Sequence, residues 1–196
     1  MSAAAASLPP DLQELLDTWD AVDRDAEALL LPLDDEQFNW SPAPGAWSIA
    51  QCLDHLNVAN AVYLEGIRQA IAQAERAGYE RRGPIAPTWW GRRFIASMGP
   101  RAGASMRMRA PRKIRPAPRR LKAEVWPEFV RLHNRLRALV SDQGARLDLN
   151  RAGFPNPFIR GIRMRVGTAL RVIAAHDRRH VRQAQRVREA PGFPRS

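Results

Sequence analysis

The sequence predicts an all-α protein, a four-helix bundle with a long irregular connection between its second and third helices. Four stretches repeat apolar residues at the three-and-four spacing of amphipathic helices, and no stretch indicates a strand. The length of 196 residues is near that of one large domain, so residues 1–196 are expected to form a single domain. Amphipathic helices without a sheet bury their apolar stripes by packing on one another.

The first helix is expected over residues 11–30, because Pro32 ends it and residues 33–46 hold further turn-forming residues. A second helix begins after Ser48. The Ser48 hydroxyl can cap the first free amides while Gln51 reaches back, and the apolar stripe that follows extends to about residue 77.

The second half of the chain predicts two more helices after a long connection. Residues 80–118 contain six prolines and four glycines and show no sustained period, so they are expected to be irregular. A third helix runs from Arg120 to Gly144. The last helix begins between Ile162 and Thr168 and ends before Pro191.

Composition excludes several classes of protein. No run approaches the 18 or so apolar residues that span a bilayer, which excludes an integral membrane protein. Residues 1–10 have no basic residue before a hydrophobic stretch, so a secretory signal is not expected, and the cytoplasm is the expected location. The single cysteine, Cys52, excludes a disulfide framework and leaves histidine and carboxylate as metal ligands.

The net charge of +11 belongs to one segment. Residues 81–120 hold 12 basic residues and no acidic one, so the rest of the chain is nearly neutral. All but two of the 31 basic residues are arginines, a bias that indicates GC-rich coding more than a surface selected for binding nucleic acid. The segment has no periodic apolar face, so we expect it to lie outside the core and to be dispensable for folding. It either shapes access to a site or is a solvated loop without such a role.

Two histidines on the last helix indicate a metal site. His176 and His180 are four residues apart, which places them about 40° apart around a helix and inside its apolar stripe. Two inward imidazoles one turn apart suit one divalent cation, whereas two core histidines would each need a separate hydrogen-bond partner. The spacing leaves either His55 or His133 as the third ligand.

Residues 47–56 and 175–183 resemble two motifs of the DinB-like (DinB/YfiT) four-helix family. The first, WSIAQCLDHL, is similar to that family's W-S-x-x-x-x-x-x-H-L, and the second, AHDRRHVRQ, to its H-x-x-x-H-x-x-Q. The resemblance implies one metal ion held by His55, His176 and His180, with open positions for water or substrate, and a homodimer. Imidazole ligands favour zinc or nickel, and iron or manganese are further candidates.

The resemblance also implies an enzyme, a metal-dependent transferase or hydrolase. Three neutral imidazoles leave the cation its charge and an open position, so it can activate a low-molecular-weight thiol for attack on a small electrophile. The alternative is a non-catalytic binding protein with a structural metal, in which the basic residues 81–120 contact nucleic acid or another polyanion. No membrane partner is expected.

Other polar and aromatic residues have supporting roles in this interpretation. Cys52 and His133 are expected to be packing residues, with His133 hydrogen-bonded, and Asp54 and Asp177 adjoin proposed ligands without binding the metal. Gln183 either orients a ligand or caps the pocket. The remaining pair, Trp89 and Trp90, resembles a base-stacking platform, but tryptophans in a long connection more often anchor it, and we expect anchoring.

Overall fold

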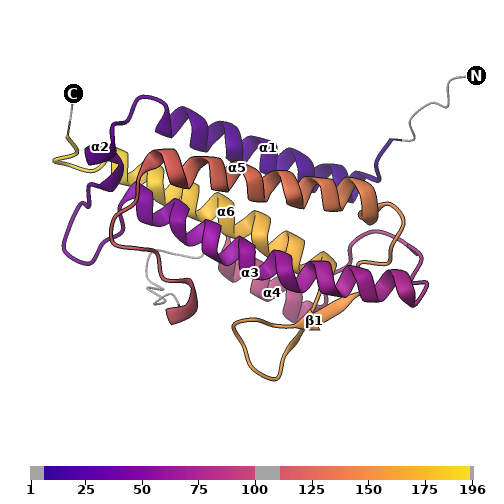
Figure 1. The fold of residues 1–196 in the computed structure, drawn as a ribbon. Helices are drawn as coiled ribbons and strands as arrows, with labels where there is room; N and C mark the ends of the chain where they lie inside the picture. The colour runs from indigo at the N-terminus through magenta and orange to yellow at the C-terminus, as the bar shows by residue number, and fades with distance from the viewer. Residues whose placement is uncertain (1–6, 100–110, 195–196) are drawn as a thin grey trace, which may run out of the picture.

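The computed structural model describes residues 7–99 and 111–194 and confirms the all-α four-helix bundle (Figure 1). Its long helices contact one another in a closed ring, in which α1 and α3 lie opposite each other and each packs against both α5 and α6. No helix in the described part of the chain has the length and apolar character needed to cross a membrane. The four long helices are α1 (Pro10–Leu30), α3 (Ile49–Arg76), α5 (Lys122–Leu139) and α6 (Val166–Arg188).

Helix direction explains the long connection between α3 and α5. These two helices are parallel (Figure 1): the side-chain Nδ2 of Asn57, near the start of α3, donates to the Val125 carbonyl at the start of α5, at 2.9 Å. Helices α1 and α6 are also parallel, because Arg188 bonds to the Leu29 carbonyl where both helices end. A chain that leaves the end of α3 must therefore return along the whole bundle before α5 can begin.

The capping box predicted at the start of α3 is present. Ser48 Oγ accepts from the Gln51 amide at 3.1 Å, and the Gln51 side chain accepts from the Ser48 amide at 3.0 Å. This cap sets the rotation of the first turns of α3, and with it the direction in which His55, two turns later, points.

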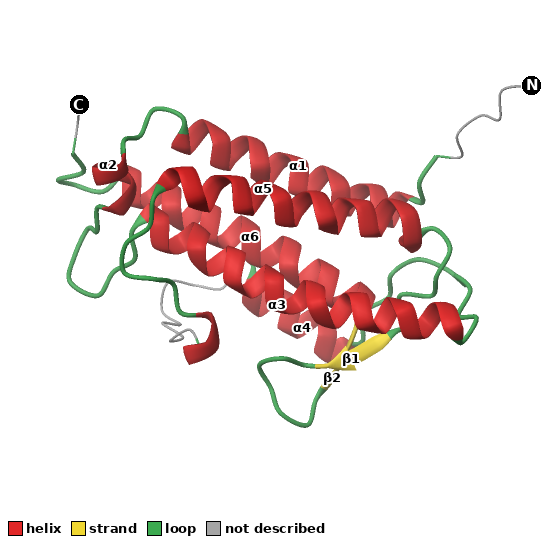
Figure 2. Cartoon of the chain, in the orientation of Figure 1, coloured by secondary structure: helices red, strands yellow, loops and turns green. Residues whose placement is uncertain are grey.

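A short helix and a short hairpin form in two connections that were expected to lack secondary structure, those before α3 and before α6 (Figure 2). A five-residue helix, α2 (Asp35–Asn39), lies within the first connection and begins with a capping box between Asp34 and Gln37. Strands β1 (Gly153–Pro155) and β2 (Arg163–Arg165) form an antiparallel hairpin before α6. These strands are too short to produce an alternating pattern that sequence reasoning could recognise.

The expectation that residues 80–118 are irregular is wrong for their middle part. Helix α4 (Trp89–Met98) forms there, capped by Thr88, and packs against α6. Its helical period is hard to recognise in the sequence because proline and glycine lie on both sides of it: Gly83, Pro84 and Pro87 before it, and Gly99 and Pro100 after it. The short 3₁₀ turn η1 (Arg112–Ile114) follows later in the same connection.

The segment also contributes to the core, contrary to expectation. Ile85 and Ile114 are buried, and Phe94, Ile95 and Met98 of α4 pack against the main core. Trp89 and Trp90 do not anchor the connection, because they are 53% and 74% exposed. The apolar inner face of α4 holds the connection instead.

Candidate metal centre

His55 from α3 and His176 and His180 from α6 converge in the structure. One ligand nitrogen from each lies within 4.8 Å of the others, and His55 Nε2 is 3.3 Å from His176 Nε2. A tetrahedral ion with metal–nitrogen bonds of about 2.0–2.1 Å sets its nitrogen ligands about 3.3 Å apart. The three imidazoles therefore fit a shared cation. His133, the other candidate from the sequence, lies outside this group.

Neighbouring groups fix the ring of His55. Its Nδ1 lies 2.6 Å from the carbonyl oxygen of Ile114, which accepts only if Nδ1 carries the proton. The lone pair is then on Nε2, the nitrogen that faces His176. The indole of Trp47, just before the helix cap, packs 4.9 Å from the His55 ring and 5.6 Å from the His180 ring, centroid to centroid.

The environment keeps all three imidazoles neutral. Burial, together with the positive charge of Arg179 and the adjacent His55, lowers the pKa of His176 to about 3. Burial and the neighbouring imidazoles hold the pKa of His180 well below its ordinary value. Burial also lowers the pKa of His55, although the Ile114 carbonyl opposes the shift. Neutral imidazole is the form that binds metal, so no proton must leave at pH 7.

A second polar cluster crosses the bundle beside the three histidines. Asp177, the residue after His176, is fully buried, and its Oδ1 accepts from the side-chain Nδ2 of Asn60 at 3.0 Å. Its Oδ2 lies 3.3 Å from Nε2 of His133 on α5, the helix diagonally opposite in the ring. Asp177 thus adjoins a candidate ligand and faces away from the metal position.

His133 is charged and pairs with carboxylates on both sides. Its Nδ1 lies 2.5 Å from Asp23 Oδ1, and Arg137 donates to the other oxygen of Asp23 at 2.6 Å. Burial alone would lower the pKa of His133, but the bonds to Asp177 and Asp23 outweigh it and raise the pKa to about 9. The expected hydrogen-bonded role of His133 agrees with these contacts, and they tie α1, α5 and α6 together behind the three histidines.

Asp54 has a structural role at the edge of the site. Its Oδ2 accepts the amide of Ala117 at 2.8 Å, and its Oδ1 lies 3.6 Å from the Arg120 guanidinium. The carboxylate therefore holds the chain after η1 against α3, which keeps the Ile114 carbonyl on His55. Cys52 is fully buried, and burial raises the pKa of its thiol, so it offers no thiolate at neutral pH.

One cation and one amide lie beside the histidines on α6. Arg179 is close enough to lower the pKa of both His176 and His180, and its Nη1 donates to the Ser97 carbonyl of α4 at 3.1 Å. The side chain of Gln183 opposes the fall in the pKa of His180, which favours the orienting role over capping.

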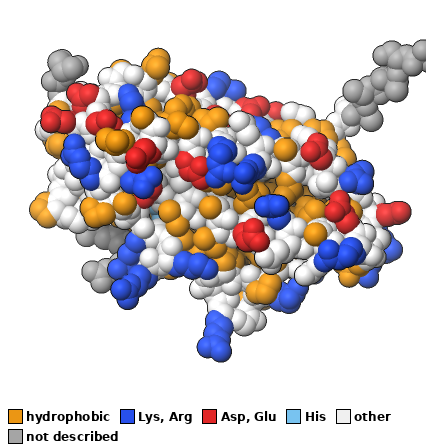
Figure 3. Space-filling view, in the orientation of Figure 1, with side chains coloured by type: hydrophobic (Ala, Val, Ile, Leu, Met, Phe, Trp, Pro, Cys, Tyr) orange, Lys and Arg blue, Asp and Glu red, His pale blue; other side chains and the backbone are white. Residues whose placement is uncertain are grey.

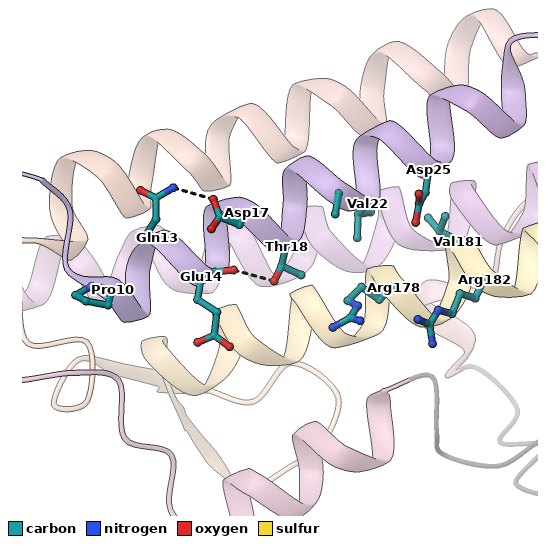
Figure 4. A pocket seen from close by; sticks show the side chains of 11 residues that line it. Pro10, Gln13, Glu14, Asp17, Thr18, Val22, Asp25, Arg178, Val181 and Arg182 are labelled. Carbon is teal, nitrogen blue, oxygen red and sulfur yellow. Dashed lines mark hydrogen bonds between the residues drawn. The ribbon is translucent and has the colours of Figure 1, made fainter.

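A groove of about 530 Å³ between α1 and α6 lies apart from this centre (Figure 4). Glu14, Asp17 and Asp25 of α1 and Arg178 and Arg182 of α6 line it. Arg178 lies about 160° around the helix from His176, so the groove opens on another side of α6.

Sequence reasoning missed the groups that support the three histidines. The Ile114 carbonyl, Asn60 and Asp23 each bond to a residue far away in the sequence, and no motif links the members of these pairs. Trp47 carried a detectable signal, because it opens the motif that resembles the DinB-like family, although its contact with the imidazoles needs the folded chain.

Comparisons with known proteins place this arrangement in a family. The sequence matches the DinB superfamily over residues 9–184, most of its length. The chain belongs to the DinB superfamily. This confirms the resemblance seen in residues 47–56 and 175–183. No curated protein sequence matches the chain.

A solved structure shares the fold of this DinB-superfamily chain. It is YfiT from Bacillus subtilis, which is 14% identical and superposes with a TM-score of 0.58 over 98% of this chain and 95% of its own. That protein is described as a probable metal-dependent hydrolase with an unusual four-helix bundle topology. At this identity the likeness establishes the shared fold alone.

Proposed function

We propose that His55, His176 and His180 bind one divalent metal ion and that the chain is a metal-dependent enzyme. The observation that carries the proposal is the convergence of three neutral imidazole nitrogens within 4.8 Å. Zinc and nickel suit this ligand set best, and iron or manganese would also bind nitrogen. The description of YfiT as a probable metal-dependent hydrolase supports the same class of chemistry.

The reaction that we propose is transfer of a small electrophile to a low-molecular-weight thiol. A metal ion at this position would lower the pKa of a bound thiol and so supply a nucleophile at neutral pH. The side chains around the metal position would bind the substrate. Trp47 forms an apolar wall beside the imidazoles, and the charge of Arg179 favours an anionic group nearby. Because Cys52 stays a buried thiol, an external nucleophile is required.

The bond changes in this reaction balance without a further reagent. The thiol sulfur forms a bond to the electrophilic carbon, the leaving group departs with its electron pair, and the thiol proton goes to solvent. Hydrolysis is the second candidate because YfiT is described as a hydrolase, and it replaces the thiol by water. The assembly that we propose is a homodimer, which light scattering after gel filtration would test.

Elemental analysis of protein purified without a histidine tag tests the metal site. We expect about one ion per chain after supplementation with zinc or nickel. Replacing His176 and His180 together by Gln should abolish binding, whereas Arg24→Gln on the exposed face of α1 should leave it unchanged. Stoichiometry near zero with every metal, or unchanged in the double variant, would contradict the proposal.

Assays with and without a thiol separate the two reactions. In the first, the enzyme is mixed with a small thiol and a halogenated nitroarene, and consumption of the thiol is followed. In the second, release of acid from a small ester or amide is followed without thiol. Both activities should disappear on chelation. Ester hydrolysis without thiol transfer would support the hydrolase, and failure of both assays with metal bound would contradict an enzyme using these substrate classes.

A further inference from the structure

Trp89 and Trp90 are the most conspicuous feature that the metal centre does not explain. The two indoles are 53% and 74% exposed, and they meet edge to face with their centroids 4.4 Å apart. Large aromatic side chains are more stable when buried than when exposed to water, so exposed tryptophans commonly mark a contact surface. Since they do not anchor the connection, their position on α4 needs another explanation.

The fold holds this pair in a fixed place. A Cβ added at Gly91 would lie 3.3 Å from both Pro87 and Thr168, so the first turn of α4 packs closely on the start of α6. Thr88 caps the same turn through the Gly91 amide, and Arg179 bonds to the carbonyl of Ser97 near the other end. Contacts with α6 therefore hold helix α4 in place at both of its ends.

The two sides of α4 differ in chemistry. Its aliphatic and phenyl side chains, Phe94, Ile95 and Met98, face the bundle. Its outer side carries tryptophan and arginine, and the guanidinium of Arg93 lies 5.2 Å from the ring centre of Trp89. At about 100° per residue, Arg93 lies between Trp89 and Trp90 around the helix, so cation and indoles share one surface.

We propose that the outer face of α4, formed by Trp89, Trp90, Arg92 and Arg93, binds single-stranded nucleic acid. Exposed aromatic faces stack on bases of any sequence, and neighbouring guanidinium groups neutralise phosphates. The surroundings favour a polyanion, because residues 81–120 contain no Asp or Glu. Within the described residues no carboxylate forms an ion pair with Arg92 or Arg93. On the face shown in Figure 3, Lys and Arg side chains also occupy the lower rim, where Asp and Glu are not seen.

The composition of α4 favours nucleic acid over an anionic lipid surface. A helix that lies in a membrane interface buries a broad apolar face of Trp, Phe and Leu side chains at the acyl boundary. Helix α4 turns Phe94, Ile95 and Met98 toward the bundle, so its outer side offers two tryptophans among arginines, an arrangement better suited to bases and phosphates than to a bilayer. None of the four residues of this surface is a candidate metal ligand, so this binding does not require the proposed metal.

Fluorescence anisotropy of a labelled oligothymidine, titrated with the full chain at low and at raised salt, tests the proposal. We expect binding that weakens as salt rises and that chelation leaves unchanged. Trp90→Leu keeps a large apolar side chain but removes the stacking face, so it should weaken binding about tenfold, and Trp89→Leu should act in the same direction. Arg93→Gln should weaken binding and flatten its salt dependence.

Matched controls separate this surface from general basicity. Arg24→Gln removes the same charge from α1, and Leu31→Ala removes another exposed apolar side chain, so both should bind as the parent chain does. Circular dichroism should show that every variant is folded. Lack of oligothymidine binding at low salt, or binding insensitive to both tryptophan variants, would overturn the proposal. Binding to phosphatidylserine vesicles that the leucine variants retain, without oligothymidine binding, would overturn it in favour of a membrane surface.

Discussion

At the scale of single residues, the buried ionic cluster behind the three histidines has the clearest energetic consequence. His133 and Asp177 are both fully buried, and each supplies the charge that the other needs. An ion pair in a core is costly to form, but removing one member is more costly still because it leaves the other charge unpaired. The cluster therefore fixes how α5 and α6 pack.

Replacing His133 by Gln should destabilise the chain by about 3 kcal/mol, because Asp177 and Asp23 both lose a cationic partner. Urea unfolding at neutral pH measures the change. Arg135→Gln, two residues later and exposed on the same helix, should stay within about 0.5 kcal/mol of the parent chain. Equal stability of the two variants would show that His133 is not charged in the core.

Helix packing depends on small residues where elements approach closely. A Cβ added at Gly66 of α3 would lie 2.5 Å from the ring of Phe154 on β1. In an open helix, Ala would be favoured over Gly by about 1 kcal/mol, but here the ring must move with its strand. The glycine is thus needed for the hairpin to pack on α3.

Gly66→Ala should therefore lower the free energy of unfolding by about 1–3 kcal/mol, the usual cost of overpacking. The matched control is Gly83→Ala, since a Cβ at Gly83 meets nothing within 4 Å. Thermal unfolding of the two variants compares them directly. A Gly66 variant more stable than the parent chain would mean that the hairpin moves aside without cost.

The turn η1 connects the basic segment to the proposed metal centre. Its Ile114 side chain is buried, and its carbonyl holds His55. This contact and the packing of α4 on the bundle argue against the sequence-based expectation that residues 81–120 are dispensable for folding. Only replacement of residues that lack such contacts should leave both the fold and the centre intact.

Ile114→Ala should loosen η1 and lower metal affinity about tenfold, the low end of the loss found when a group that orients a ligand is removed. Competition with a chromophoric chelator measures this affinity. Arg112→Ala, exposed in the same turn, is the control and should bind as the parent chain does. Unchanged affinity in Ile114→Ala would indicate that Asp54 and Trp47 suffice to orient His55.

For the whole molecule, the buried histidines make stability depend on pH in two opposite ways. His133 has its pKa raised to about 9, so it binds more protons folded than unfolded between pH 6.5 and 9, and stability falls as pH rises through that window. His176 has its pKa lowered to about 3, so the unfolded chain binds more protons below pH 6.5, and stability falls as pH decreases.

The metal-free chain should therefore be most stable near pH 6.5. Each of these two groups contributes a slope of about 1.4 kcal/mol per pH unit on its side of the maximum. Urea unfolding after chelation, repeated from pH 5 to 9, measures the profile. His133→Gln should remove the alkaline slope and leave the acid one, and an alkaline slope that persists in this variant would assign it to another group.

The sequence alone determined the four helices, the cap at Ser48 and the inward pair His176 and His180, because these depend on residues a turn or two apart. The resemblance to the DinB-like family, carried by two short motifs, directed attention to His55 as the third member. Spacing could not choose between His55 and His133, since both lie on helices whose rotation is set by packing.

Only the tertiary structure decided what surrounds these residues. Helix α4 and the β1–β2 hairpin form because the bundle offers them a surface, and neither has enough local pattern to be recognised in isolation. The Ile114 carbonyl reaches His55, and Asp23 reaches His133, across 59 and 110 residues of chain. The first contact depends on how the parallel helices α3 and α5 are connected, and the second on how α1 packs against α5. Both follow from global packing that no local sequence pattern encodes.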